Sequence, residues 1–201
     1  VCDYLLRKNY NVIGLDNLST GNKKFNSEAS LSKNFNFYKI DLLNDKIDKY
    51  FKNANIVFHL AANADVRFGL NHRSKDIEQN IIVTQRILEC IVKYKIKRIV
   101  FSSTGSVYGE TTNIPTNENT AFPIQTSLYG ASKLSAEGLI SAYSEGYDLQ
   151  SYIFRFVSIL GERYSHGHVF DFIKNLKKDP SRLVVLGDGT QKKSYLNIED
   201  C

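Results

Sequence analysis

The sequence contains little cysteine and no long hydrophobic run. Its three cysteines, Cys2, Cys90 and Cys201, lie far apart among 201 residues and form no CxxC pair. This pattern argues against a disulfide framework and against a thiolate metal site. No apolar stretch approaches the roughly 18 to 20 residues that cross a bilayer, and nothing resembles a signal peptide. We therefore expect a cytoplasmic protein with plain thiols and no membrane contact.

A metal site and a nucleic-acid patch are also poorly supported. His166 and His168 have no Cys, Asp or Glu partner at ligand spacing, so we expect loop residues and no metal. The net charge is +5, from 26 basic and 21 acidic residues, and the densest basic cluster is KYKIKR at 93–98. Lysines that close a helix satisfy the negative end of its dipole and then face water. We expect no nucleic-acid partner, and a flat salt response of any binding would exclude one.

Short β-branched and aromatic runs alternate with longer segments of helical period. Several runs are apolar on both faces, as strands of a parallel sheet covered by helices are. We therefore predict an α/β fold with a doubly wound parallel sheet (Rossmann-like), whose ligands lie beyond the carboxyl ends of the strands. The predicted strands are 11–16, 35–40, 55–61, 97–103, 150–156 and 183–186, and the predicted helices are 1–9, 76–95, 127–145 and 167–178.

The sequence has no GxGxxG or GxxGxxG loop. A dinucleotide-binding domain begins with a strand and such a loop, and an acidic residue ends the second strand about 20 residues later. Asp16 ends such a strand, and counting back from it passes Val1. We therefore expect an internal fragment. Residues 1–157 are predicted to be a nucleotide-binding domain without its first strand and glycine-rich loop, and 158–201 the start of a small, truncated C-terminal substrate-binding region.

Asp16 has two interpretations. An Asp that follows a strand is often a turn former or a helix cap. In a dinucleotide site it would instead bind the ribose 2′-hydroxyl, and its charge would repel a 2′-phosphate. The second interpretation predicts NAD rather than NADP as the cofactor.

Tyr129 and Lys133 lie four positions apart in the stretch SLYGASKLSAE, residues 127–137. Thr126 or Ser127 can cap a helix there, and the spacing then places the ammonium beside the phenol on one face. A free phenol has a pKa of about 10, and an adjacent cation favours the phenolate and lowers that pKa. The pair could thus provide a base that works near neutral pH.

The YxxxK spacing alone is weak evidence, because it also occurs where the ring is core and the lysine reaches water. Its position in the chain strengthens the interpretation. A second polar cluster, FSSTGSVYG at 101–109, follows a predicted central strand, where parallel sheets build their sites. A hydroxyl there could bond the substrate oxygen that the phenol deprotonates, so both clusters would face one crevice.

Five motifs occur in the order and spacing of one known family: LDNLSTG, VFHLAA, FSSTGSVYG, YGASK and VLGDGTQKKSYLNIED. The sequence resembles the extended short-chain dehydrogenases/reductases, specifically the NAD-dependent epimerase/dehydratase family that UDP-glucose 4-epimerase typifies. The likeness covers essentially the whole chain. It implies an NAD cofactor, a nucleotide-sugar substrate, and a homodimer formed through the helices at 76–95 and 127–145.

The resemblance also implies roles for individual residues. Tyr129 matches the catalytic base, Lys133 the lysine that holds the nicotinamide ribose, and Thr104 the residue that bonds the sugar hydroxyl. The positions that match cofactor contacts are Asp16, Asn17, Thr20, Gly21, Asp41, Leu42, Leu60, Ala61, Ala62, Asn80, Ser102, Tyr129, Lys133 and Phe156. The positions that match substrate contacts are Thr104, Tyr129, Ser158 and Lys193.

Some positions depart from the family pattern or discriminate within it. Ser158 stands where an asparagine is usual, and Lys193 stands where many members have an arginine, so a point charge replaces a bidentate fork. Gly105 and Ser106 stand where nucleotide-sugar dehydratases place an acid and a base directly after the catalytic threonine. An epimerase needs no such pair, because it moves only a hydride and a proton at C4.

The resemblance therefore predicts an NAD-dependent nucleotide-sugar 4-epimerase of the UDP-glucose/UDP-galactose type, which works through a transient 4-keto sugar. Two alternatives stay open. One is another dehydratase, decarboxylase or reductase of the same family, and the other is a non-catalytic NAD-sensing protein on the same fold. Unchanged activity of a Tyr129→Phe variant would favour the non-catalytic alternative.

Overall fold

The computed structural model describes residues 1–63, 71–121, 124–165, 167–185, 187–190 and 192–201. The chain divides into two compact units, Val1–Arg155 and Phe156–Cys201. The roles expected for residues 1–157 and 158–201 stay predictions. Within the described part of the chain, no helix combines the length and the apolar character needed to cross a membrane.

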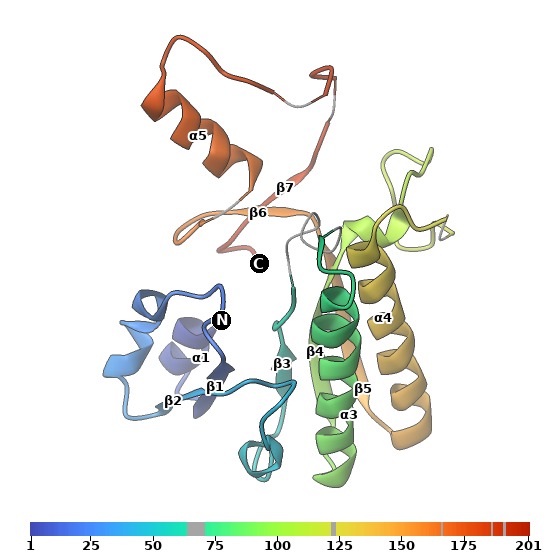
Figure 1. The fold of residues 1–201 in the computed structure, drawn as a ribbon. Helices are drawn as coiled ribbons and strands as arrows, with labels where there is room; N and C mark the ends of the chain where they lie inside the picture. Colours follow the sequence, from blue (N-terminus) through green and yellow to red (C-terminus); the bar gives the residue numbers. More distant parts are fainter. Residues whose placement is uncertain (64–70, 122–123, 166, 186, 191) are drawn as a thin grey trace. The chain divides into compact units, whose positions relative to one another are not determined.

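Strands and helices alternate along the first unit (Figure 1). Among its helices, η4 is a π-helix and the other η elements are 3-10 helices. Its elements are α1 (Cys2–Arg7), β1 (Val12–Asp16), η1 (Lys23–Asn26), η2 (Ala29–Leu31), β2 (Phe35–Lys39), η3 (Asp48–Tyr50), β3 (Val57–His59), η4 (Ile77–Ile82), α3 (Val83–Lys93), β4 (Arg98–Thr104), η5 (Gly105–Tyr108), α4 (Leu128–Tyr147) and β5 (Gln150–Phe156).

The strands of the first unit form two sheets. β1 and β2 form a parallel pair, and β3, β4 and β5 form a three-stranded sheet with β4 in the middle. β3 and β4 are parallel, with His59 opposite Phe101 at their carboxyl ends. In a doubly wound sheet of order 3-2-1-4-5-6, these two groups correspond to strands 3-2 and 4-5-6. Parallel strands that alternate with helices confirm the predicted α/β class.

Helices α3 and α4 lie side by side against the three-stranded sheet (Figure 1). Apolar residues recur at helical spacing on α3, so one stripe of that helix is buried. Leu15 in β1 and Ile40, directly after β2, pack against the same core. The buried core residues are Ile47, Phe51, Val83, Ile87, Leu88, Cys90, Ile91, Ile96, Ile99, Phe101, Ala136, Ile140 and Leu149.

The second unit contains β6 (Ser158–Leu160), α5 (His168–Lys178) and β7 (Tyr195–Asn197). β6 and β7 pair in parallel, with Ser158 opposite Tyr195. The sequence analysis did not predict these two strands. It predicted a strand at 183–186 instead, which is wrong for residues 183–185, because they form no strand; Leu186 lies outside the described residues. A β-branched run becomes a strand only where a partner strand pairs with it.

Candidate active site

The start of α4 is fixed by a side-chain cap. Ser127 has extended backbone angles, and its hydroxyl accepts a hydrogen bond from the Gly130 amide at 3.0 Å. The predicted cap at Ser127 is therefore confirmed. The helix begins at Leu128, so Tyr129 lies in its first turn and Lys133 one turn further on the same face.

The carboxyl end of β4 meets this helix turn. Thr104 is the last residue of β4, and its hydroxyl accepts a hydrogen bond from the Ser106 amide at 3.1 Å, which caps η5. Thr104 is buried, and its side chain is hydrogen-bonded to Tyr129. The structure thus brings together the two polar segments that the sequence suggested, one at the end of a strand and one on a helix.

Lys133 is buried, with 2% of its surface exposed. Its Nζ donates a hydrogen bond to the Ser102 carbonyl oxygen at 2.8 Å and lies 4.7 Å from the centroid of the Phe101 ring. Burial lowers the pKa of Lys133 to about 8, and the Glu137 carboxylate acts in the opposite direction. The amine is therefore held at the carboxyl end of β4 and titrates near the physiological range.

The pKa of Tyr129 differs from the expectation. We predicted that the neighbouring ammonium lowers it, but in the described chain the pKa of Tyr129 is raised. Burial is the largest cause, the Thr104 hydrogen bond lowers the pKa, and the Asp76 carboxylate raises it. The predicted direction is wrong here because burial of the phenol outweighs the effects that would lower its pKa, and the Lys133 amine donates to the Ser102 carbonyl oxygen.

The π-helix η4 connects this region to the loop after β3. Asn80, buried in η4, accepts a hydrogen bond from the Asn63 amide at 2.9 Å and donates one to the Ser132 hydroxyl at 2.8 Å. Ser132 in turn donates to the Tyr129 carbonyl oxygen at 2.8 Å. Asn63 also donates from its side chain to buried Asp76 at 2.8 Å. This chain of hydrogen bonds anchors the backbone of Tyr129, and π-helical turns are frequent at functional sites.

His59 lies under Lys133 as a neutral side chain. It is 2% exposed, and its Nε2 is 2.8 Å from the Thr84 hydroxyl oxygen. Burial first, and the Lys133 charge second, lower the pKa of His59 to about 3. It therefore adds no second positive charge beside the amine near neutral pH.

The predicted cofactor residues at the other strand ends form turns. Asp16, at the end of β1, accepts a hydrogen bond from the Leu18 amide at 2.6 Å, and Asp41, after β2, accepts one from the Leu43 amide at 2.9 Å. The turn-forming interpretation of Asp16 is thus confirmed, and it does not exclude a ribose contact. Near these turns and after β3, the remaining candidates are Asn17, Thr20, Gly21, Leu42, Leu60, Ala61 and Ala62.

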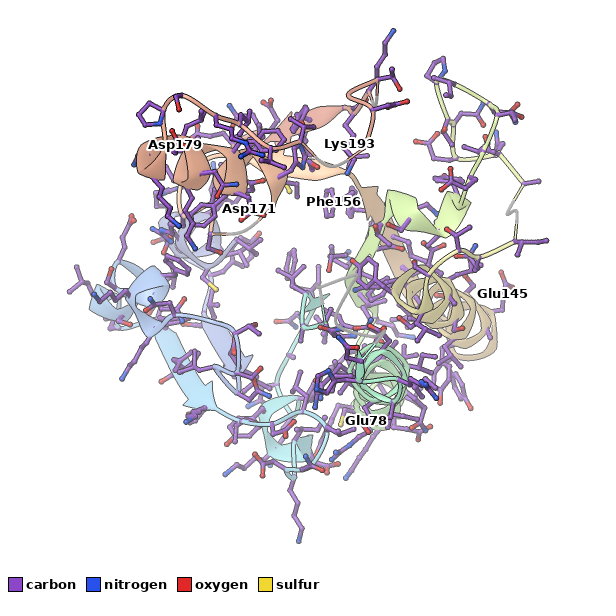
Figure 2. The ribbon with its side chains drawn as sticks, turned by 45° about the horizontal axis from the view of Figure 1, so that its top comes forward. Glu78, Glu145, Phe156, Asp171, Asp179 and Lys193 are labelled. Atoms are coloured by element: carbon purple, nitrogen blue, oxygen red, sulfur yellow. The ribbon has the colours of Figure 1, made fainter. Side chains whose placement is uncertain are left out.

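Three of the predicted site residues, Phe156, Ser158 and Lys193, belong to the second unit. Figure 2 labels Phe156 and Lys193. Phe156, the last residue of β5, is also the first residue of this unit, and Ser158 begins β6. Because Ser158 pairs with Tyr195, the start of β7 lies opposite it, two residues after exposed Lys193. The β6–β7 pairing therefore brings the two substrate candidates to the same end of this small sheet.

The residues that the structure describes contain no group of three or more His, Cys, Asp and Glu side chains able to hold a metal ion. His168 begins α5, and its Nε2 contacts the Tyr195 hydroxyl. His166, the other histidine weighed as a ligand, lies outside the described residues.

A model of the NAD dependent epimerase/dehydratase family matches residues 1–201. The chain belongs to this family. The family resemblance inferred from the five motifs is thereby confirmed, and so is the Rossmann-like fold, which the solved structures share.

Relatives in the NAD-dependent epimerase/dehydratase family match the whole chain. A protein of Methanocaldococcus jannaschii, provisionally named a UDP-glucose 4-epimerase, is 35% identical over 100% of this chain and 66% of its own length. A UDP-glucuronate 4-epimerase of Thermodesulfobacterium geofontis is 31% identical over 100% of this chain and 64% of its own length. The chain thus spans about two thirds of the length of these curated relatives.

The chain is also similar in structure to a solved 4-epimerase. The UDP-glucuronic acid 4-epimerase from Bacillus cereus, in complex with NAD, superimposes with a TM-score of 0.90 at 31% identity. The superposition covers 100% of this chain and 65% of that one.

NAD is the cofactor of this family, and the strand ends fit it. A side chain at position 21 would place its Cβ 3.5 Å from one Asp16 carboxylate oxygen and 3.6 Å from the other. Gly21 leaves that carboxylate uncovered, as a ribose contact requires. At the end of β4, a buried ammonium and a phenol lie on one helix face, and both are donors that would fit the second ribose of NAD.

Motif-based reasoning missed several residues that contact the candidate catalytic side chains or their helix. The hydrogen bonds of Ser132 and Asn63 were not predicted, because a serine and an asparagine carry no distinctive spacing. Glu137 had a signal, since it lies four residues after Lys133 and eight after Tyr129 on a buried helix face. A buried acidic side chain at that spacing should prompt a search for a basic partner, which is Arg155.

Proposed function

We propose that the protein is an NAD-dependent nucleotide-sugar 4-epimerase of the UDP-glucose/UDP-galactose type. The observation that carries the proposal is the meeting of Thr104, Tyr129 and Lys133 at the end of β4, followed by Gly105 and Ser106. Gly105 and Ser106 follow Thr104, so these two positions lack the acid and base that a dehydratase uses to expel water. The relatives named as 4-epimerases support the same reaction.

In this proposal, Thr104 and Tyr129 act on the C4 hydroxyl of the sugar. The Thr104 hydroxyl orients that oxygen, and the Tyr129 phenolate accepts its proton. When C4 is reduced again, Tyr129 returns the proton, so the residue alternates between base and acid. The hydrogen bond with Thr104 favours the phenolate, whereas burial favours the neutral phenol.

Lys133 has two functions in this proposal. Its ammonium would hold the ribose next to the nicotinamide, and its charge favours the phenolate form of Tyr129. Bound NAD supplies the hydride acceptor at C4, later returns the hydride, and adds a positive ring to the site. Asp16 would hold the other ribose, with Asp41 and Leu42 beside the adenine.

Substrate binding would involve the second unit. Lys193 would provide a positive charge for the diphosphate, without the bidentate geometry of an arginine. Relatives include enzymes named for UDP-glucose, UDP-glucuronate and UDP-N-acetylglucosamine. The sugar is therefore a separate question from the reaction, and the UDP-glucose/UDP-galactose pair is the first to test.

Product analysis of the complete protein tests the proposal. Incubation with NAD and a panel of UDP-glucose, UDP-galactose, UDP-glucuronate and UDP-N-acetylglucosamine should interconvert one pair of C4 epimers without net change in NAD. The panel also includes dTDP- and GDP-sugars. Accumulation of a stable 4-keto-6-deoxy sugar or a decarboxylated sugar would contradict the epimerase assignment.

A non-catalytic NAD-binding protein is the second candidate. It is favoured by the raised pKa of Tyr129, which keeps the phenol protonated, and by the departures at Ser158 and Lys193. It predicts NAD binding with no product from any sugar in the panel. The homodimer also stays a proposal, and light scattering of the complete protein measures it directly.

The packing of Gly130 yields a prediction about turnover. An added Cβ at this position would lie 2.9 Å from the Ser106 carbonyl oxygen, which is backbone and cannot rotate away. Gly130→Ala should displace η5 by a few tenths of an ångström and thereby misplace Thr104. We expect kcat to fall by about tenfold, since a misplacement of about 1 Å can cost about 100-fold.

The matched control for this variant lies on the same helix. Gly138 has no atom within 4 Å of an added Cβ, so Gly138→Ala should leave kcat unchanged. It should also raise the melting temperature, because alanine favours a helix by up to about 1 kcal/mol over glycine. Equal kcat values for the two variants would show that the contact between Gly130 and η5 does not position Thr104.

A further inference from the structure

Glu137 is a buried carboxylate on the same face of α4 as Tyr129 and Lys133. It is 5% exposed and lies one helical turn beyond Lys133. A charged side chain at this depth requires a partner, because burial of an isolated charge is costly. The partner is Arg155 near the end of β5, whose side chain is 20% exposed.

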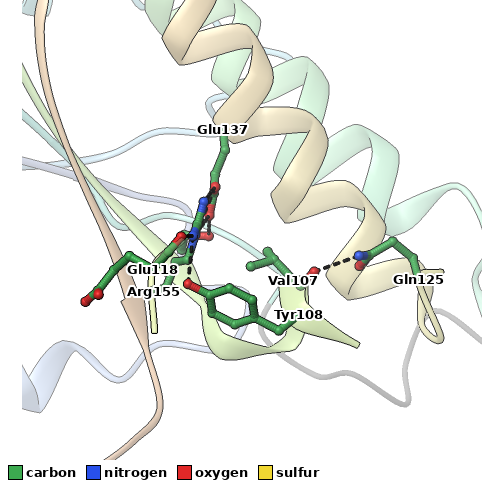
Figure 3. Close-up of polar contacts among 7 residues, drawn as sticks. Val107, Tyr108, Glu118, Gln125, Glu137 and Arg155 are labelled. Atoms are coloured by element: carbon green, nitrogen blue, oxygen red, sulfur yellow. Dashed lines mark hydrogen bonds and ion pairs between the residues drawn. The ribbon is translucent and has the colours of Figure 1, made fainter. Parts of the chain in front are cut away.

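The ion pair is held by several hydrogen bonds (Figure 3). Arg155 donates from Nη2 to Glu137 Oε2 at 2.8 Å and from Nε to Oε1 at 3.1 Å, which is a bidentate geometry. The same guanidinium donates to the Tyr108 hydroxyl at 2.7 Å and lies 5.1 Å from the centroid of that ring. It also donates to the Glu118 carbonyl oxygen at 3.2 Å. The pair therefore ties α4 and β5 to the segment after β4.

These contacts fall on both sides of Thr104. On the strand side, the Ser103 hydroxyl donates to Glu137 Oε1. On the other side, Tyr108 ends η5, the helix that Thr104 caps, and receives the Arg155 hydrogen bond. The residue proposed to orient the sugar hydroxyl thus lies between two anchors that share one ion pair.

We propose that Glu137 is a positioning residue for the proposed epimerisation: with Arg155 it holds the segment on both sides of Thr104, and it keeps a negative charge one helical turn from the Lys133 ammonium. The inference rests on the proposed function and adds to it a residue outside the motifs. The charge of Glu137 opposes the effect of burial on Lys133, so the carboxylate helps the amine to stay protonated.

Besides Glu137, groups from β3, β4 and α4 surround Lys133 and could affect its pKa. From β3, His59 is neutral near pH 7 and adds no charge. From β4, the amine meets the Ser102 carbonyl oxygen and the Phe101 ring, which do not titrate. From α4 itself, Tyr129 is the other titratable neighbour.

Two further charged side chains, Asp76 and Arg155, act on the neighbours of Lys133. Asp76, buried before η4, acts on the phenol of Tyr129. Arg155 faces Glu137 from β5 and partly neutralises it. Removal of Glu137 and removal of Arg155 should therefore change the charge near Lys133 in opposite directions, which gives the proposal its test.

The test compares three variants of the complete protein. Glu137→Gln keeps an acceptor for Ser103 and removes the charge. Arg155→Met removes the guanidinium and leaves the carboxylate. Glu137→Asp keeps the charge on a shorter side chain and serves as the conservative variant. For each, kcat/KM for the active sugar pair is measured against pH, together with the melting temperature.

Glu137→Gln should move the alkaline limb of the profile to lower pH by about one unit, because a nearby opposite charge raises the pKa of an amine by about 1–3 units. At pH 8 this lowers the charged fraction of Lys133 from about a half to about a tenth, a loss of about fivefold in kcat/KM. Arg155→Met should leave the limb in place or move it to higher pH. Glu137→Asp should keep the wild-type limb and lose only kcat.

Superimposable pH profiles for Glu137→Gln and Arg155→Met, with activity that falls only as stability falls, would overturn the proposal. A second readout does not depend on activity. The ¹³Cε signal of Lys133, identified by its loss in Lys133→Met, should titrate at lower pH in Glu137→Gln than in the wild type. If no sugar reacts, the proposed function fails, while this titration still decides whether Glu137 acts on Lys133.

Discussion

Tyr129→Phe in the complete protein is expected to lower kcat for C4 epimerisation by about 10³-fold, with little change in KM. Proton transfer by a positioned side chain contributes about 10²–10⁴-fold to an enzymatic rate. Phenylalanine keeps the ring that packs in the first turn of α4 and loses only the oxygen that exchanges the proton. A loss confined to kcat indicates an interaction made in the transition state.

The structure adds a reason to expect the full loss. Tyr129 shares a hydrogen bond with Thr104, so the sugar hydroxyl would lie within reach of both side chains. Without the phenol, Thr104 can still orient the sugar hydroxyl, but it cannot accept the proton of that hydroxyl. Among the described residues, His59 is a neutral base in this region, but it is only 2% exposed and is hydrogen-bonded to Thr84. It cannot replace the phenol at the substrate.

Tyr143 offers a matched control on the same helix. Its hydroxyl donates to Glu89, which raises the pKa of Tyr143 to about 12, and it lies away from the end of β4. Tyr143→Phe should retain kcat within about twofold, in the range expected of a surface substitution. Comparable activity of Tyr129→Phe and the wild type would contradict the catalytic role proposed for Tyr129.

Local sequence patterns predicted most of the first unit. Strands 11–16, 35–40 and 150–156 match β1, β2 and β5 to within one residue, because each is a run of β-branched or aromatic residues next to a turn. The helix predicted at 127–145 matches α4, whose Ser127 cap is visible in the sequence. Patterns of this kind act over a few residues, so they can be recognised without tertiary information.

Features that depend on distant partners could not be predicted in this way. β6 and β7 are three residues each, and their pairing joins Ser158 to Tyr195 across the second unit. The raised pKa of Tyr129 depends on burial and on Asp76, which lies far away in the chain. The anchor of Thr104 depends on Arg155, which no motif connects to Glu137. In each case the decisive contact is between segments whose spacing carries no periodic signal.

The burial of Lys133 has an expected consequence for stability. Between pH 7 and 9.5, the free energy of unfolding of the wild type should rise by about 2 kcal/mol relative to Lys133→Met. The pKa of Lys133 is about 8 in the folded chain against 10.5 for an unburied lysine, so within this window the unfolded chain binds more protons. Stability then increases with pH, because deprotonation relieves the cost of burying the charge. Urea unfolding at several pH values measures the difference between the two proteins.

Lys93→Met is the control for this experiment. Lys93 is paired with Asp48 at 2.5 Å on the surface, and that hydrogen bond raises the pKa of Lys93. When folding raises the pKa of a lysine, its contribution to the free energy of unfolding is fully present below its pKa in the unfolded chain. The contribution of Lys93 should therefore stay constant from pH 7 to 9.5. If the wild type and Lys133→Met show the same pH dependence, the ammonium of Lys133 is not destabilised by burial.

The charge of Lys133 lowers the stability of the folded chain but is required by the proposed function. A methionine at position 133 would remove a buried charge and would also remove the cation beside Tyr129. Near neutral pH the chain therefore keeps an ammonium that its folded core disfavours, and the Glu137 carboxylate reduces that disadvantage. In the proposed mechanism, the same low-dielectric surroundings that make the charge costly would also strengthen its effect on a Tyr129 phenolate one helical turn away. Lys133→Met should accordingly lose epimerase activity at every pH, while its stability relative to the wild type is highest on the acidic side of pH 8.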